Sequence, residues 1–262
     1  MDFRTIVDID KPSFEIQPCE KMLFVGSCFA DNIGAKFVEE KFRATVNPFG
    51  VMYNPASIQH TVQRISSDNP ANIAVFTLGT NHVYILNETG KIVDNCQKRP
   101  QRFFTEKELS VDECVNYLSK AAEPFVHVII TVSPIRYAKY GYHGSALSKA
   151  TLLLAANELV ARFPDKITYF PAYEIVNDEL RDYRFYKSDM LHPSEQAVEY
   201  IYERFAETFF SSATKQFVLE WKPIREALSH KPFHPESEEY KKFILKTRQE
   251  LDALRIKYPL MP

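Results

Sequence analysis

The sequence lacks long apolar runs and a strong net charge, and each absence excludes a class of protein. No stretch approaches the ~18 consecutive apolar residues that a membrane-spanning helix needs. The formal net charge is only −2, so electrostatics give no case for nucleic acid or an anionic membrane surface. We therefore expect neither nucleic acid nor a membrane as a partner.

Paired cysteines and cofactor motifs are also missing. The four cysteines are irregularly spaced without a CxxC pair, and residues 1–10 carry charges where a signal peptide needs an apolar core. These features favour free thiols and a cytoplasmic location. No HExxH, P-loop or GxGxxG motif is present. Pro232 and Pro235 disrupt the helix that would bring His230 and His234 together as metal ligands. The sequence therefore predicts no metal and no cofactor.

What the chain does have is an alternation of apolar strand and helix patterns. Its 262 residues are 45% hydrophobic, which suffices for a full core. Buried strands are predicted at residues 22–25, 44–46, 73–76, 127–132 and 167–170, and a β-hairpin at 83–86 and 91–94. Helices are predicted at about 31–42, 56–65, 106–121, 145–162 and 193–210. This order predicts an α/β fold with a parallel sheet covered on both faces, and a site at the carboxyl ends of its strands.

The C-terminal segment differs in composition, so we divide the chain into a domain at 1–220 and a helical extension at 221–262. Pro223, Pro232 and Pro235 interrupt the start of this extension, and a helix at 237–255 follows. Its apolar stripe runs through Tyr240, Phe243, Ile244, Thr247, Leu251 and Leu254. The stripe predicts a helix that packs on its own domain or forms a homodimer contact.

The first candidate for chemistry is Ser27. It follows a short apolar run and Gly26, and the helix pattern begins directly after it. A strand that turns sharply into a helix leaves backbone N–H groups unpaired, and these can hold an oxyanion beside a serine hydroxyl. An ordinary Gly-Ser turn is the alternative. Cys28 is a second candidate nucleophile, although the neighbour of a nucleophile in such a turn is expected to point into the core.

The second candidate is the pair Asp189 and His192. A carboxylate three residues from a histidine can hold its Nδ1 proton while Nε2 faces a serine elsewhere in the chain. The chain order of such a site is Ser27, Asp189, His192. The alternative is that Asp189 caps a helix and that His192 merely precedes its start.

Several segments resemble one known family. Gly26-Ser27-Cys28-Phe29-Ala30 matches the signature of the GSCFA family, which is similar to the SGNH (GDSL-type) hydrolases. The resemblance covers about residues 22–210 and includes Asn47-Pro48-Phe49-Gly50, Thr77-Leu78-Gly79-Thr80, Thr131-Val132-Ser133-Pro134, Ser148-Lys149 and His192-Pro193. It implies a three-layer α/β/α sandwich with a flavodoxin-like sheet, a serine nucleophile and an Asp-x-x-His pair.

The resemblance also implies an oxyanion hole. Ser27 matches the nucleophile and, through its own N–H, the first donor. Gly50 matches the second donor and Asn81 the third, with Asn95 as the alternate for the third. One departure is that Val25-Gly26-Ser27 replaces the superfamily's Gly-Asp-Ser.

Together these residues predict a serine ester hydrolase that acts on an acyl or acetyl ester of a carbohydrate or other small molecule. Ser27 attacks, His192 transfers the proton and Asp189 orients His192. An O-acyltransferase using the same residues and a catalytically silent binding module on the same fold are the alternatives.

Overall fold

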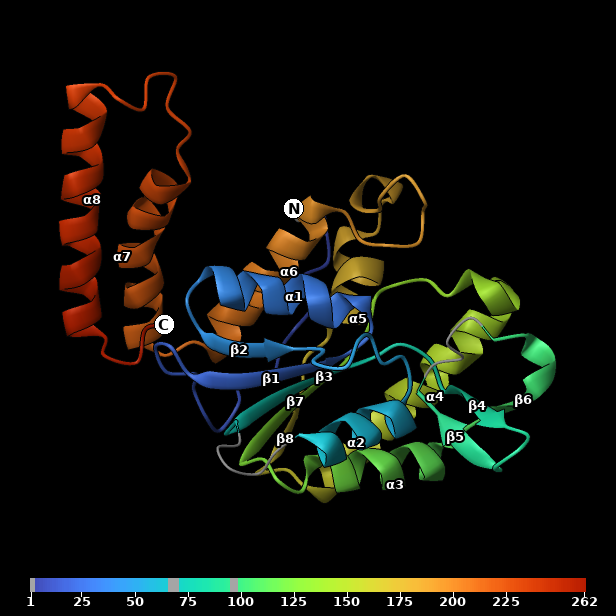
Figure 1. Ribbon diagram of the computed structural model, residues 1–262. Helices are drawn as coiled ribbons and strands as arrows, with labels where there is room; N and C mark the ends of the chain where they lie inside the picture. The colour runs from blue at the N-terminus through green and yellow to red at the C-terminus, as the bar shows by residue number, and fades with distance from the viewer. Residues whose placement is uncertain (1–2, 66–70, 95–98) are drawn as a thin grey trace.

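A five-stranded parallel sheet forms the centre of the computed structural model, which describes residues 3–65, 71–94 and 99–262 (Figure 1). The strand order is β2-β1-β3-β7-β8. Taken along the chain, this is the 2-1-3-4-5 order of flavodoxin-like sheets, which confirms the expected fold class. The strands are β1 (Lys21–Gly26), β2 (Arg43–Val46), β3 (Ile73–Leu78), β7 (His127–Val132) and β8 (Ile167–Tyr169).

Helices cover both faces of this sheet (Figure 1). One face packs against α2 (Pro55–Arg64), α3 (Val111–Ala122) and α4 (Gly141–Arg162). The other packs against α1 (Cys28–Glu39), α6 (Glu195–Phe209) and the short α5 (Ala172–Glu174), which continues into the π-helix η3 (Ile175–Leu180). Side chains alternate between the two cores along each strand: Leu23 and Val25 join one, and Phe24 joins the other.

A small antiparallel sheet is inserted after β3. It has the order β5-β4-β6, with β4 (His82–Leu86), β5 (Lys91–Val93) and β6 (Phe104–Glu108). The hairpin prediction is confirmed, but the helix predicted from residue 106 is wrong at its start. Residues 104–108 pair with β4, and α3 begins only after Ser110, whose capping box with Glu113 fixes the helix start.

Other helix boundaries and core positions also differ from the predictions. Helix α1 begins at Cys28 rather than Asp31, because Ser27 itself caps it, and α4 begins at Gly141 rather than at residue 145. The helix pattern at 145–162 predicts Leu147 and Leu154 as core contacts, but both side chains are exposed. Short 3-10 helices lie at η1 (Gln101–Phe103), η2 (Ala138–Tyr140) and η4 (Tyr183–Phe185).

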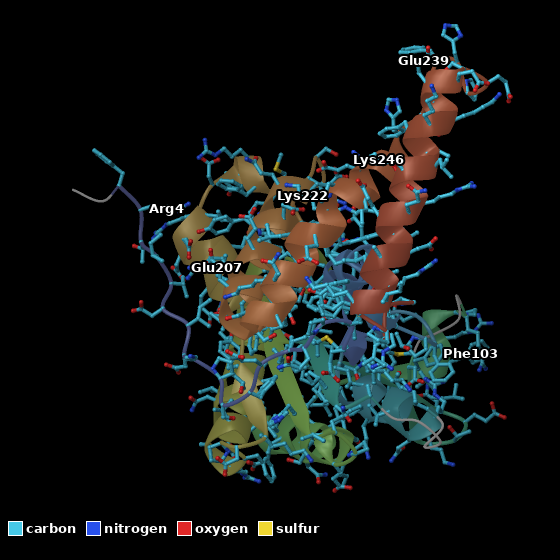
Figure 2. The ribbon with its side chains drawn as sticks, turned by 90° about the vertical axis from the view of Figure 1, so that its left-hand side faces the viewer. Arg4, Phe103, Glu207, Lys222, Glu239 and Lys246 are labelled. Atoms are coloured by element: carbon cyan, nitrogen blue, oxygen red, sulfur yellow. The ribbon has the colours of Figure 1, made fainter. Side chains whose placement is uncertain are left out.

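The C-terminal extension is a pair of helices, α7 (Ser212–Ser229) and α8 (Glu238–Lys257), that stand side by side at one end of the molecule (Figure 1). Figure 2 labels Lys222 on α7 and Lys246 on α8. Pro223 lies inside α7 rather than interrupting the segment, and the division proposed at 220/221 falls within this helix. The indole N–H of Trp221 donates to the Glu39 carbonyl (2.9 Å), and Leu254 of α8 packs in the same cluster. Helix α8 thus packs on its own chain, and a homodimer contact stays a prediction.

No helix in the described ranges is long and apolar enough to cross a membrane.

Candidate functional site

Ser27 lies where strand β1 turns into α1. Gly26 has a φ of 148°, and a Cβ at this position would overlap the carbonyl oxygen of Thr77, so the turn requires glycine. The Ser27 side chain caps α1 by accepting from the Phe29 N–H (3.2 Å). Its hydroxyl also lies 3.1 Å from Thr77 Oγ1, and Ser27 is only 2% exposed. The serine is therefore at a helix N-terminus on the carboxyl edge of the sheet, as the sequence predicted.

Asp189 and His192 form a pair in the loop that precedes α6. Asp189 Oδ2 lies 2.6 Å from His192 Nδ1, and Oδ1 accepts the backbone N–H groups of Leu191 (2.8 Å) and His192 (3.0 Å). These backbone hydrogen bonds, together with the bond to the imidazole, lower the pKa of the Asp189 carboxyl to about 2. Both side chains are partly exposed. The pair leaves Nε2 of the imidazole as the ring atom that can meet a substrate or a serine.

The loop of this pair is attached to the end of β7 through Arg136. The Arg136 backbone N–H donates to the Leu191 carbonyl (3.0 Å), and its Nη1 donates to the Met190 carbonyl (3.2 Å). The guanidinium also lies over the ring of Tyr186, which forms a β-bridge with Pro193. His192 is thereby held near the carboxyl ends of the strands, although no hydrogen bond joins it to Ser27 in the described part of the chain.

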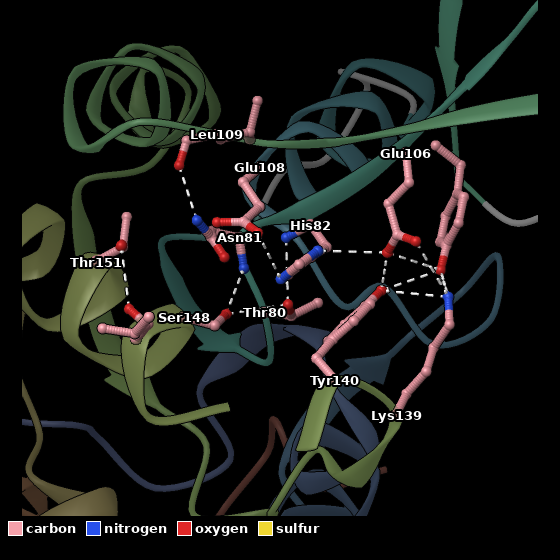
Figure 3. A network of polar contacts seen from close by, with 12 residues as sticks. Thr80, Asn81, His82, Glu106, Glu108, Leu109, Lys139, Tyr140, Ser148 and Thr151 are labelled. Atoms are coloured by element: carbon pink, nitrogen blue, oxygen red, sulfur yellow. Dashed lines mark hydrogen bonds and ion pairs between the residues drawn. The ribbon is translucent and has the colours of Figure 1, made fainter. Parts of the chain in front are cut away.

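The three expected oxyanion donors are engaged by other acceptors. The Ser27 N–H donates to the Thr77 carbonyl (2.9 Å), and the Gly50 N–H donates to the Asn47 carbonyl (2.8 Å). The amide of Asn81 donates to the Leu109 carbonyl (2.8 Å), as Figure 3 shows. The alternate Asn95 lies outside the described residues. In this structure, each of the three named donors thus bonds a backbone carbonyl of its own chain.

The first turn of α1 contributes another donor. The Phe29 N–H bonds the Ser27 side chain and the Ala30 N–H bonds the Ser27 carbonyl, whereas the Cys28 N–H has no acceptor within its own helix. The N–H of the residue after the nucleophile serves as an oxyanion donor in strand-turn-helix hydrolase sites. The same role fits the Cys28 N–H here.

The Cys28 side chain does not point into the core as expected. It is half-buried, and its Sγ lies 3.6 Å from the hydroxyl of Tyr53. Burial, followed by the hydrogen bond to Cys28, raises the pKa of Tyr53, so the phenol stays protonated. Both residues therefore belong to the surroundings of the serine turn.

Asn47 and Gly79 are neighbours of Ser27 whose roles were not predicted from the sequence. Asn47 Oδ1 accepts the Gly26 N–H (2.9 Å), and its amide donates to Asp31 (2.7 Å). A Cβ at Gly79 would lie 3.4 Å from the Cβ of Ser27, so the backbone there packs directly on the serine. The one sequence feature that could have identified them is their position directly after β2 and β3, where a site is expected.

The inserted sheet is joined to the start of α4 by a polar network (Figure 3). The ring of Tyr140 stacks on His82 with centroids 3.7 Å apart, and the Tyr140 hydroxyl bonds Glu106. Ser148 on α4 accepts the Asn81 N–H and bonds the Thr80 hydroxyl, both at 3.0 Å. The loop after β3 is therefore held by α4.

Comparison with known proteins identifies a family whose model matches most of the chain. The model of the GSCFA family matches residues 21–72 and 67–205, and the model of the GSCFA domain protein, C-terminal domain, matches 221–261. A solved candidate acylhydrolase of Bacteroides fragilis is 12% identical with a TM-score of 0.50, covering 80% of this chain and 92% of its own. A variant of an acetyl-xylooligosaccharide esterase from Geobacillus is 10% identical with a TM-score of 0.46, covering 74% and 96%. No curated protein matches the sequence. At such low identity, the structural likeness concerns the fold alone.

Proposed function

The chain belongs to the GSCFA family, and we propose that it is a serine ester hydrolase that works through an acyl-enzyme on Ser27. His192 takes the proton of the Ser27 hydroxyl and later delivers it to the leaving alcohol. Asp189 orients the imidazole and stabilises its charged form. Water then resolves the acyl-enzyme with the same histidine as base.

The position of Ser27 is the observation that carries this proposal. A serine that caps a helix has its hydroxyl beside the positive end of the helix dipole, where negative charge is stabilised. The Cys28 N–H at the same helix start supplies a donor for the developing oxyanion. We propose this N–H as the first donor, in place of the Ser27 N–H that Thr77 occupies.

The reaction requires one local rearrangement. The Ser27 hydroxyl now bonds Thr77 and Phe29 and must rotate about its Cα–Cβ bond to meet Nε2 of His192. Catalytic hydrogen bonds are often long or poorly aligned before substrate binds, so the present partners of the Ser27 hydroxyl are compatible with the mechanism. The side chains of Asp189 and His192 are partly exposed, so a substrate can reach Nε2 of the imidazole.

The substrate we propose is an acyl or acetyl ester of a carbohydrate or other small molecule, processed by an SGNH-type mechanism. An O-acyltransferase would differ only in the last step, where an acceptor alcohol replaces water. Adding alcohols to an active preparation and measuring the ratio of ester to acid products separates these two activities.

A catalytically silent module is favoured by one observation. The Ser27 hydroxyl is buried and engaged by Thr77, with no bond to His192. Such a module would keep the fold and bind a ligand at this edge without forming a covalent intermediate.

Labelling with a fluorophosphonate probe, followed by peptide mapping, decides between a serine enzyme and a catalytically silent module. Wild-type protein should be labelled on Ser27, and Ser27→Ala should abolish labelling. Ser110→Ala is the matched control, because Ser110 also caps a helix through its side chain but lies on α3. An unlabelled wild-type protein, or label on another residue, would contradict the proposal.

A further inference from the structure

Lys149 is a buried cation that the proposed reaction does not use. It lies on the face of α4 that packs against the sheet and is 3% exposed. Its Nζ donates to the carbonyl of Gly79 (2.7 Å) and to that of Ser133 (2.8 Å). No carboxylate of the described residues pairs with it. Burying a lysine without a counter-charge is costly, so its presence here calls for a function that an apolar residue could not supply.

The two carbonyls begin the loops that carry the two halves of the site. Gly79 directly follows β3, and its backbone packs on the Ser27 side chain. Ser133 directly follows β7, and three residues later Arg136 bonds the Leu191 carbonyl, next to His192. One ammonium group therefore joins the loop beside the nucleophile to the loop that holds the histidine.

The arrangement does not depend on a single protonation state. An ammonium group has three N–H donors and a neutral amine has two, so both can keep the bonds to the two carbonyls. Burial lowers the pKa of Lys149 to about 7, which brings the neutral form within reach near neutral pH. The two bonds, rather than the charge, are the constant feature.

We propose that Lys149 is a positioning residue that fixes the distance between Ser27 and His192 by holding the loops after β3 and β7 together. This inference rests on the proposed function. A displacement of about 1 Å in a catalytic group costs roughly 10²-fold in rate, so a tie of this kind has a large effect on turnover.

The test compares Lys149→Met with Lys166→Met. Methionine is also unbranched and is only one atom shorter than lysine, but it lacks the amine that donates both hydrogen bonds. Lys166 is half-buried and, like Lys149, donates to the backbone, but to one carbonyl only, that of Glu123 (3.0 Å). It directly precedes β8 and so lies at the amino ends of the strands, away from the site. Hydrolysis of 4-nitrophenyl acetate gives kcat and KM, and hydrogen–deuterium exchange reports on residues 79–82 and 133–137.

We expect Lys149→Met to lose roughly 10²-fold in kcat with little change in KM, and to exchange faster in both loops, whereas Lys166→Met behaves as wild type. Lys149→Gln keeps amide donors and should lose less. Wild-type kcat in Lys149→Met, a loss confined to KM, or failure of both Lys149 variants to fold would overturn the proposal. If wild-type protein is inactive and unlabelled, the proposed function fails, and exchange in the two loops then decides the positioning role alone.

Discussion

The carboxylate of Asp189 contacts His192 in two ways: one oxygen lies 2.6 Å from the ring Nδ1 and the other accepts the backbone N–H at 3.0 Å. The side chain thus fixes both the ring and the loop from which the ring projects. The lowered pKa of Asp189 keeps it ionised throughout the assay range, and the associated stability is lost only as pH falls below about 4 towards 2.

Replacing Asp189 by Asn separates these two contacts. Asparagine keeps an oxygen for the backbone N–H groups but has no charge to orient and stabilise the imidazolium. We expect kcat to fall roughly 10²–10⁴-fold with the fold unchanged, as circular dichroism and thermal unfolding would show. Asp182→Asn is the control, because Asp182 likewise accepts a backbone N–H (Arg184, 2.9 Å) in a neighbouring loop. Equal activities for the two variants would argue against a catalytic Asp189.

Ser27 and His192 should behave as one unit. Each single alanine variant should lose roughly 10³–10⁶-fold in kcat, and the double variant little more, because either loss disables the same step. Steady-state kinetics of the four proteins measure this directly. Losses that multiply would mean that the two residues act independently. Activity in Ser27→Ala that disappears in Cys28→Ala would transfer the nucleophile to Cys28.

Asn81 is now expected to affect stability more than turnover. Its amide bonds the buried Leu109 carbonyl, so Asn81→Ala leaves that acceptor unsatisfied and should cost about 1–3 kcal/mol of unfolding free energy. At a temperature where both proteins are folded, the loss of kcat in Asn81→Ala should be much smaller than the roughly 10²–10³-fold loss expected when an oxyanion donor is removed. Asn87→Ala removes a similar but exposed bond to a carbonyl (Arg102, 3.2 Å) and serves as the control. A collapse of kcat in Asn81→Ala would restore Asn81 to the oxyanion hole.

Lys149 predicts a pH dependence of stability. Its pKa falls from 10.5 to about 7 on folding, and desolvation is the cause. Between these values the unfolded chain binds more protons, so the unfolding free energy rises with pH by up to about 1.4 kcal/mol per unit. Below the lower value both states are protonated and Lys149 adds no slope.

Chemical denaturation of wild type and Lys149→Met measures this slope, with unfolding curves recorded about every pH unit from about pH 6 to about pH 10. The difference between the two proteins should grow in favour of wild type as pH rises above about 7. A constant difference would mean that Lys149 titrates normally and that its burial is not as deep as the contacts indicate.

Strands and the serine turn could be predicted because their signals are local. The β-branched run at 127–132 and the apolar run that stops at Gly26 identify buried strands without further information. By contrast, β6 has a polar, alternating sequence that makes sense only beside β4, and it was taken for the start of a helix. Its partner strand, not its composition, determines its structure.

The hydrogen-bond partners in the site could not be predicted because they come from distant positions. Asn81 and Leu109 are 28 residues apart, and Lys149 and Gly79 are 70 apart. On the long helix predicted at 145–162, the sequence pattern favours capping or packing for Ser148-Lys149 over a Ser-Lys pair with a chemical role. A lysine on the buried face, between Ser148 and Leu152, was the one available signal of its role.

Trapping the acyl-enzyme tests the central claim most directly. Wild-type protein mixed with 4-nitrophenyl acetate and quenched in acid during turnover should carry one acetyl group, which peptide mapping by mass spectrometry should place on Ser27. His192→Ala should show little or no acetylation in the same interval, and Cys28→Ala should be acetylated as wild type is. Acetyl on Cys28, or ester hydrolysis with no covalent intermediate at Ser27, would contradict the account.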